Sequence, residues 1–113
     1  MPFINVKTNA KVSADLAEQI KSKLGTAITA IPGKSEGWLM VGIEGEQMLY
    51  FRGTAEPAAM VSVSLYGSAS GNAMSTLTAH ISGILTDTLG IPSDRIYVSY
   101  MCTDNWGWNG SNF

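Results

Sequence analysis

The dipeptide Ile-Pro occurs twice in this chain, at residues 31–32 and 91–92, which are 60 positions apart. In both places a helical pattern of apolar residues comes before the dipeptide, and a strand-like run follows it. Proline disfavours helical geometry in the residue that precedes it, so each dipeptide ends a helix. The sequence therefore predicts an internal duplication of a strand-helix-strand unit.

The first unit is read from alternating and helical patterns. Residues 3–8 form a strand-like run, Ser13 suits a helix N-cap, and an apolar run at 38–43 indicates a second strand. The helix between them, predicted over residues 14–31, has an apolar stripe at spacings of three and four, which faces a core. The stripe consists of Leu16, Ile20, Leu24, Ile28 and Ile31.

The second unit repeats this plan. Residues 60–66 alternate as a strand, a helix ends at Gly90, and residues 95–102 give a further strand. The glycine and serine run at 67–71 is interpreted as the connection from strand to helix. The apolar stripe of this helix consists of Leu77, Ile81, Ile84, Leu85 and Leu89.

Two such units predict an α+β fold. Strands joined through a helix run parallel with a right-handed crossover, so two units side by side give a four-stranded mixed sheet with two helices on one face. The 113 residues suffice for one domain, spanning residues 1–113. The strands are expected to carry apolar residues on both faces, so the bare face needs a cover and self-association is predicted. The residues behind that expectation are Phe3, Val6, Leu39, Val41, Val61, Val63, Ile96 and Val98.

Between the units, residues 44–47 read as a turn and residues 48–51 as a short extra strand, long enough to pair with the sheet edge of a neighbouring copy. Only 14% of the residues are charged, against roughly 25% in typical soluble domains. Part of the neutral surface is therefore expected to be buried against other subunits.

Composition also excludes several classes of function. The net charge of −2 provides no basic surface for nucleic acid. No apolar run is long enough to span a membrane and no signal peptide is recognisable, so we expect a cytoplasmic protein without membrane contact. Cys102 is the single cysteine, which excludes an intrachain disulfide and a cysteine-based metal site. We expect Cys102 to be a small hydrophobic residue near a strand end, and His80 to be exposed.

Pro2 follows the initiator Met1 and precedes the first strand. Cells usually remove Met1 when a small residue follows, and the mature chain would then begin with the secondary amine of proline. A buried amine can be neutral at physiological pH and act as a base. The simpler interpretation is that Pro2 merely follows the start codon.

Several motifs together resemble the macrophage migration inhibitory factor family of the tautomerase superfamily. They are the proline after Met1, the duplicated units, Gly33-Lys34, Asp94-Arg95-Ile96-Tyr97 and the tail Gly107-Trp108-Asn109. The match runs from Pro2 to Phe113, with one short gap near residue 10. The resemblance implies a homotrimer whose sheets face a central axis, with active sites at subunit interfaces. It also implies tautomerisation of phenylpyruvate-like keto acids and dopachrome analogues without a cofactor or metal.

The resemblance assigns roles to individual positions. Pro2 would be the catalytic base, and Lys34 would meet a carboxylate or carbonyl oxygen of the substrate. Tyr66 stands where a backbone N–H binds substrate, and Tyr97 matches an aromatic residue that the adjacent subunit contributes. Ser99 stands where animal members have asparagine, so a shorter hydroxyl would have to make that contact. The other matching pocket positions are Phe3, Trp38, Trp106, Trp108 and Phe113.

The residue types suit this chemistry. Keto-enol tautomerisation needs a base near its operating pKa and a positive group beside the developing enolate. An ordinary α-amino group titrates near pH 8, and burial among aromatic side chains with Lys34 nearby should lower that pKa. Trp106 is bulkier than the residue usual at its position, which should narrow the pocket mouth or add stacking area. Where animal members have Cys-x-x-Cys, this chain has Ala58-Ala59-Met60-Val61, which excludes thiol oxidoreductase activity.

Purely structural interpretations of the same residues also remain open. Lys34 could be a solvated loop lysine, Tyr97 could be simple packing, and residues 106–108 could clamp the tail at a subunit interface. Two alternatives to an enzyme also stay open. One is a cytokine-like signalling or binding protein with weak or vestigial tautomerase activity, which would act on a receptor after leaderless secretion. The other is a trimeric scaffold without pocket activity.

Overall fold

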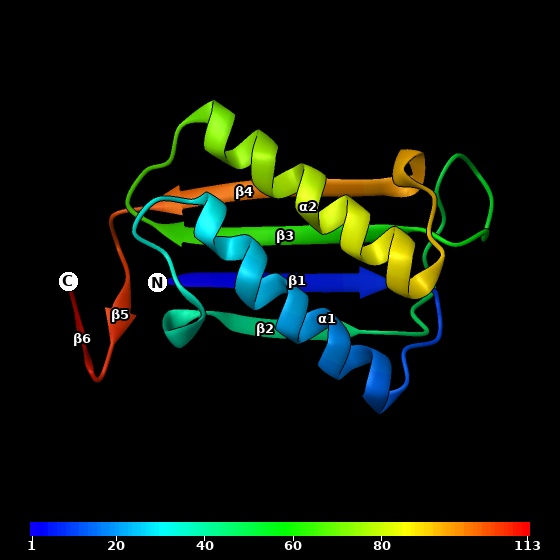
Figure 1. Cartoon of the computed structure of the whole chain (residues 1–113), viewed down its shortest axis with the longest axis horizontal. Helices are drawn as coiled ribbons and strands as arrows, with labels where there is room; N and C mark the ends of the chain where they lie inside the picture. The colour runs from blue at the N-terminus through cyan, green and yellow to red at the C-terminus, as the bar shows by residue number, and fades with distance from the viewer.

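The computed structural model describes all residues 1–113, and the chain forms two successive β-α-β units (Figure 1). The first unit comprises β1 (Pro2–Thr8), α1 (Ala14–Ala27) and β2 (Met40–Glu44), and the second comprises β3 (Ala59–Tyr66), α2 (Gly71–Leu89) and β4 (Ile96–Thr103). Single 3₁₀ turns occupy Ile28–Ala30, Glu36–Trp38 and Ser93–Arg95, and the chain ends in a small hairpin of β5 (Gly107–Trp108) and β6 (Ser111–Asn112).

The four long strands form one mixed sheet in the order β2-β1-β3-β4. Within each unit the two strands are parallel, and the two units meet through the antiparallel pair β1 and β3. Both helices cover the same face of the sheet (Figure 1). The predicted α+β fold with a duplicated unit is therefore confirmed.

The helix ends follow the local signals in the sequence. The Ser13 hydroxyl accepts a hydrogen bond from the Leu16 N–H at 3.2 Å, which caps α1 as predicted. The α-helix ends at Ala27, and a 3₁₀ turn continues to Ala30, so the predicted end at residue 31 was slightly late. Helix α2 ends at Leu89 and is capped by Gly90, whose φ of 70° is the left-handed geometry that favours glycine.

The core lies between the helices and the covered face of the sheet. Its α1 and α2 members include most of the two predicted stripes, because spacings of three and four place those side chains on one side of each helix. The strands contribute alternate residues. Fully buried members with the largest side chains are Ile4, Ile20, Leu24, Ile28, Ile31, Leu65, Leu77, Ile81, Leu85 and Ile91.

The expectation that apolar strand residues lie on both faces is wrong. Of the eight residues behind it, only Phe3 lies on the open face, and the other seven belong to the core or pack against it. Alternation within each strand is regular, so residues that seemed mixed along the sequence share one face. The centre of the open face is polar, and exposed Met40, Tyr97 and Met101 flank it on the two edge strands. The polar centre consists of Asn5, Ser62, Ser64 and Ser99.

The predicted extra strand at residues 48–51 is absent from the single chain. Only Phe51 makes an isolated bridge, with Thr54. Backbone carbonyls of this segment are bonded to side chains instead: Asn9 donates to Leu49 and Arg95 donates to Phe51. The segment between β2 and β3 is thus held by side-chain hydrogen bonds, with no strand beside it.

Two smaller predictions concern single residues. His80 is exposed on α2, as predicted. Cys102 lies near the end of β4, but its side chain is exposed in the single chain, so it does not serve as a buried hydrophobic residue there. No helix has the length and apolar character needed to cross a membrane.

Candidate functional site

A cleft of about 360 Å³ lies at the end of the sheet where β1 begins. Pro2 is buried there as the first residue of β1, paired with Leu65 of β3. The amino terminus and the C-terminal hairpin lie close together at this end of the molecule (Figure 1). Five predicted site residues line the cleft: Pro2, Phe3, Trp38, Trp106 and Trp108.

The C-terminal hairpin supplies one wall of this cleft. Asn109 and Gly110 have φ angles of 54° and 88°, and a two-residue turn with both values positive suits the twist of a β-hairpin. The Phe113 N–H also donates to the Trp106 carbonyl at 3.0 Å, which folds the last residue back. The Asn-Gly pair was a turn signal that the sequence interpretation missed.

Aromatic contacts attach the hairpin to the rest of the site. The rings of Trp38 and Trp108 meet edge to face, with centroids 5.2 Å apart. Phe113 stacks on Trp108 at 6.3 Å and contacts Tyr66 at 5.1 Å. These side chains therefore form a continuous aromatic wall at this end of the sheet.

Lys34 stands next to this wall. Gly33 has a φ of 80°, and the Lys34 N–H donates to the Ile31 carbonyl at 3.1 Å, so a tight turn after α1 orients the lysine. The Lys34 ammonium group donates to the Tyr66 carbonyl oxygen at 2.8 Å and lies 5.9 Å from the centre of the Tyr66 ring. This hydrogen bond uses one of its three N–H donors.

The terminal amine lies beside that cation. Burial lowers the pKa of the Met1 amino group below its ordinary value, and the positive charge of Lys34 and a hydrogen bond with it lower the pKa further. Pro2, the next residue along the chain, is buried more deeply than Met1. The arrangement favours a neutral amine next to a fixed positive charge.

Tyr97 and Ser99 are not brought to this cleft within one chain. Along β3, Pro2 pairs with Leu65 whereas Tyr97 pairs with Met60, and five residues of strand correspond to about 17 Å. Tyr97 is 61% exposed, and its ring contacts Phe51 at 5.0 Å. Ser99 is exposed at the middle of the open face. The predicted site is therefore divided between two regions of the chain.

The structure adds lining residues that sequence reasoning missed. Met40 pairs with Phe3 and lies on the same face, and Leu39 and Met1 also line the cleft. The alternation of β2 could have placed Met40 on the open face, since the next residue, Val41, packs against the core. No three side chains of the types that bind metals gather anywhere in the chain.

The strand order and the single layer of two helices define a tautomerase-like fold. The family model for macrophage migration inhibitory factor matches residues 1–113, and the chain belongs to that family. It is 34% identical to macrophage migration inhibitory factor of Meriones unguiculatus over 115 aligned residues, covering 100% of this chain and 99% of the relative.

Solved structures agree with this assignment. The Leishmania major MIF2 structure is 30% identical, with a TM-score of 0.94 over 100% of this chain and 97% of that one. A homologue of macrophage migration inhibitory factor from Prochlorococcus marinus is 31% identical, with a TM-score of 0.83 over 98% of each chain. Membership of this family supports a tautomerase or cytokine-like role.

Proposed function

We propose that this protein is a cofactor-free keto-enol tautomerase of phenylpyruvate-like acids, with the amine of Pro2 as general base. The observation that carries the proposal is the amine at the start of the chain, which is partly buried and lies beside Lys34 at an aromatic cleft. The Pro2 nitrogen would become that amine once Met1 is removed. A base that is neutral near pH 7 and a cation that stabilises an enolate are the two groups that this reaction needs.

The chemistry moves one proton. The neutral Pro2 nitrogen removes a proton from the carbon next to the substrate carbonyl, and the electron pair of that C–H bond shifts onto the carbonyl oxygen. Lys34 stabilises the negative charge on that oxygen or binds the neighbouring carboxylate. The oxygen then takes up a proton from water to give the enol, and the protonated Pro2 nitrogen returns its proton to water, which restores the neutral base. The walls of Trp38 and Trp108 accommodate an aromatic ring and reduce solvation of the amine.

A homotrimer would complete the site. Tyr97 is too far from Pro2 in one chain, and it is exposed as if available to another copy. Met48 is 95% exposed and Tyr50 is also exposed, on a segment with no strand partner, which suits pairing with the edge of a neighbouring sheet. The active site would then combine Pro2 and Lys34 of one subunit with Tyr97 of the next subunit. Ser99 of that next subunit would join the site if its hydroxyl reaches the substrate.

Conversion of phenylpyruvate tests the proposal directly. Pro2→Gly keeps a terminal amine but loses the rigid ring and the secondary nitrogen, so we expect kcat/KM to fall about 100-fold or more. Lys34→Met should also lower kcat/KM, whereas Lys23→Met, which changes an exposed lysine without an ion pair, serves as the matched control. Equal rates for the native protein and Pro2→Gly would remove Pro2 from the mechanism.

The names of the relatives point to a second role, in inhibiting the migration of macrophages. Such a role would require that the protein acts outside the cell and binds to a receptor. The Pro2→Gly variant separates the two functions. If it lacks turnover but still acts on migrating cells, the signalling surface lies outside the catalytic amine.

A further inference from the structure

Arg95 is a buried cation without an acidic partner. Arg95 is the last residue of the 3₁₀ turn before β4, and it is only 8% exposed. The two ion pairs of the chain are Lys21 with Glu18 and Arg52 with Asp94. Burial of a charge is costly unless hydrogen bonds compensate, so the partners of Arg95 indicate what its position achieves.

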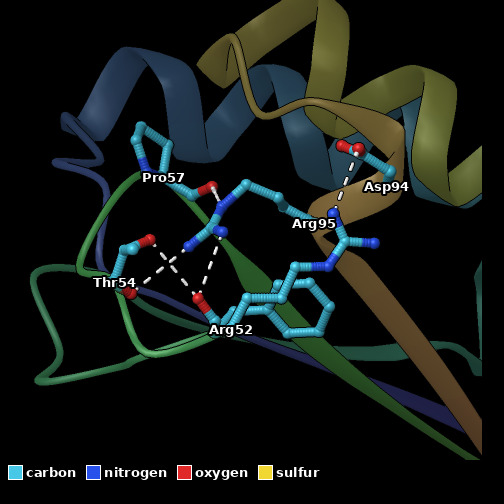
Figure 2. A network of polar contacts seen from close by, with 6 residues as sticks. Arg52, Thr54, Pro57, Asp94 and Arg95 are labelled. Atoms are coloured by element: carbon cyan, nitrogen blue, oxygen red, sulfur yellow. Dashed lines mark hydrogen bonds and ion pairs between the residues drawn. The ribbon is translucent and has the colours of Figure 1, made fainter.

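All side-chain hydrogen bonds of Arg95 go to backbone carbonyls of one segment, residues 51–57. Figure 2 shows those to Thr54 and Pro57. The guanidinium donates to Pro57 at 2.9 Å, to Glu56 at 3.0 Å, to Phe51 at 3.2 Å and to Thr54 at 3.3 Å. A rigid planar fork that binds four carbonyls fixes their relative positions. Arg95 therefore determines the shape of the turn that carries Phe51.

The same guanidinium also restrains the Phe51 side chain. It lies 5.1 Å from the centre of the Phe51 ring, and the exposed Arg52 lies 5.2 Å from that ring. Phe51 in turn meets Tyr97 edge to face, with centroids 5.0 Å apart and an angle of 82° between the rings. Arg95 and Tyr97 are thus connected through one aromatic ring.

Tyr97 has room to move without that contact. Its ring borders an apolar hollow of about 240 Å³, which Leu49, Phe51 and Met60 also line. Because the Tyr97 side chain is mostly exposed, few other atoms hold it. The edge-to-face contact with Phe51 is therefore the restraint that selects the direction of the ring.

We propose that Arg95 is a positioning residue, which fixes Phe51 and thereby holds the Tyr97 ring in the orientation in which it enters the active site of a neighbouring copy. This inference rests on the proposed function, because it assumes that Tyr97 contacts substrate across a subunit boundary. Arg95 itself does not touch substrate. Its effect should appear in substrate binding, with the proton transfer at Pro2 unaffected.

Kinetics provide the first test. Arg95→Lys keeps the charge but lacks the planar fork, and Phe51→Leu keeps the apolar volume but lacks the ring. Each should raise KM for phenylpyruvate about 2- to 10-fold with kcat within about twofold, while Phe51→Tyr, which restores a ring, should leave KM unchanged. In a Tyr97→Ala background Phe51→Leu should have no further effect. A fall in kcat at constant KM, or the same KM rise in that background, would overturn the proposal.

Nuclear magnetic resonance of ¹³C-labelled tyrosine provides a second test that needs no turnover. The Tyr97 ring signals, assigned with Tyr97→Phe, should shift in both Arg95→Lys and Phe51→Leu because the neighbouring ring moves or is lost. Arg52→Ala is the matched control, since Arg52 also contacts Phe51 but is exposed, and it should leave those signals in place. If Arg95→Lys does not fold, Phe51→Leu still tests whether Phe51 orients Tyr97. Arg95→Gln then tests whether the guanidinium hydrogen bonds are needed. Unchanged Tyr97 signals in folded variants would overturn the positioning role of Arg95. Absence of turnover in the native protein would contradict only the proposed tautomerase function.

Discussion

The backbone N–H of Tyr66 donates a hydrogen bond to the carbonyl oxygen of Met1 at 3.1 Å. Removal of Met1 would therefore free two groups together: the nitrogen of Pro2 and the N–H of Tyr66. Lys34 already lies there, bonded to the carbonyl oxygen of the same tyrosine. In the proposed mechanism the Tyr66 N–H binds substrate, and Met1 occupies this donor. Removal of Met1 would therefore create both the base and part of the binding site.

A chain that retains Met1 should be inactive and should bind substrate weakly. The Pro2 nitrogen would be an amide without basicity, and the Tyr66 N–H would remain bonded to Met1. Protein produced while methionine aminopeptidase is inhibited, and verified by intact mass, should show kcat/KM at least about 100-fold below that of the processed chain. Treatment of the same sample with the aminopeptidase should restore turnover, which rules out misfolding. Full activity of the unprocessed chain would contradict the assignment of Pro2.

The rate should depend on pH through an amine whose pKa is lowered. Burial and the charge of Lys34 both disfavour the protonated amine, so kcat/KM should rise with pH through a pKa below about 8 and then level off. Lys34→Met removes the nearby positive charge, while the burial of the amine remains. The rising limb should therefore move to higher pH in that variant, although not beyond an ordinary amine. An unmoved or lower pKa in the pH profile would show that Lys34 does not act on the base.

Asn9 should be a stability determinant of the segment between β2 and β3. Its side chain donates to the carbonyls of Leu49, Ala55 and Glu56 and accepts from the Ala58 N–H. Asn9→Ala removes these four contacts and should lower the free energy of unfolding by about 1 to 3 kcal/mol in urea titrations. Asn72→Ala, on the exposed surface of α2, should stay within about 0.5 kcal/mol. Equal stability of the two variants would show that the segment does not depend on Asn9.

Tyr100 links β4 to α2 and should make stability sensitive to alkaline pH. Its hydroxyl donates to the Met74 carbonyl at 2.8 Å and shares a 2.8 Å hydrogen bond with Thr78. Burial raises the pKa of the Tyr100 hydroxyl, and the hydrogen bond with Thr78 partly offsets this. The contribution to stability is therefore fully present below the unfolded-state value of about 10 and is lost as pH rises through the higher folded-state pKa.

Tyr100→Phe separates the two parts of that prediction. At neutral pH it should lower the free energy of unfolding by about 1 to 2 kcal/mol, because the Met74 carbonyl and the Thr78 hydroxyl lose their partner. Above pH 10 the difference between wild type and variant should shrink. Thr76→Ala, an exposed position on α2, controls for general effects of helix substitution. A difference that stays constant to pH 11 would contradict the raised pKa.

The fold was largely predictable because its determinants are local. The stripe on α1 and the hydroxyl of Ser13 act within a few residues, as does Gly90 at the end of α2. The predicted strand at residues 48–51 failed for a different reason. Its apolar residues read as a strand, but its carbonyls are bonded by Asn9 and Arg95, which lie about 40 residues away in sequence.

The site was predictable only in part. The resemblance placed Pro2, Lys34 and the aromatic tail together, and the structure brings these residues to one end of the sheet. The turn at residues 109–110 and the lining residue Met40 follow from local rules that had not been applied. No sequence pattern indicated the connection from Arg95 through Phe51 to Tyr97. Phe51 is more than 40 residues from both of the others in sequence, and the three meet only in the folded chain.

By itself the sequence determined the two repeated units, the cap of α1 at Ser13 and the end of α2 before Gly90, because periodicity and capping act over neighbouring residues. Tertiary structure alone decided that the open face has a polar centre and that Pro2 and Tyr97 lie at opposite ends of β3. Strand register sets that separation, and register depends on pairing between residues far apart in the chain. Because of this separation, the proposed active site would need Tyr97 from a second copy of the chain.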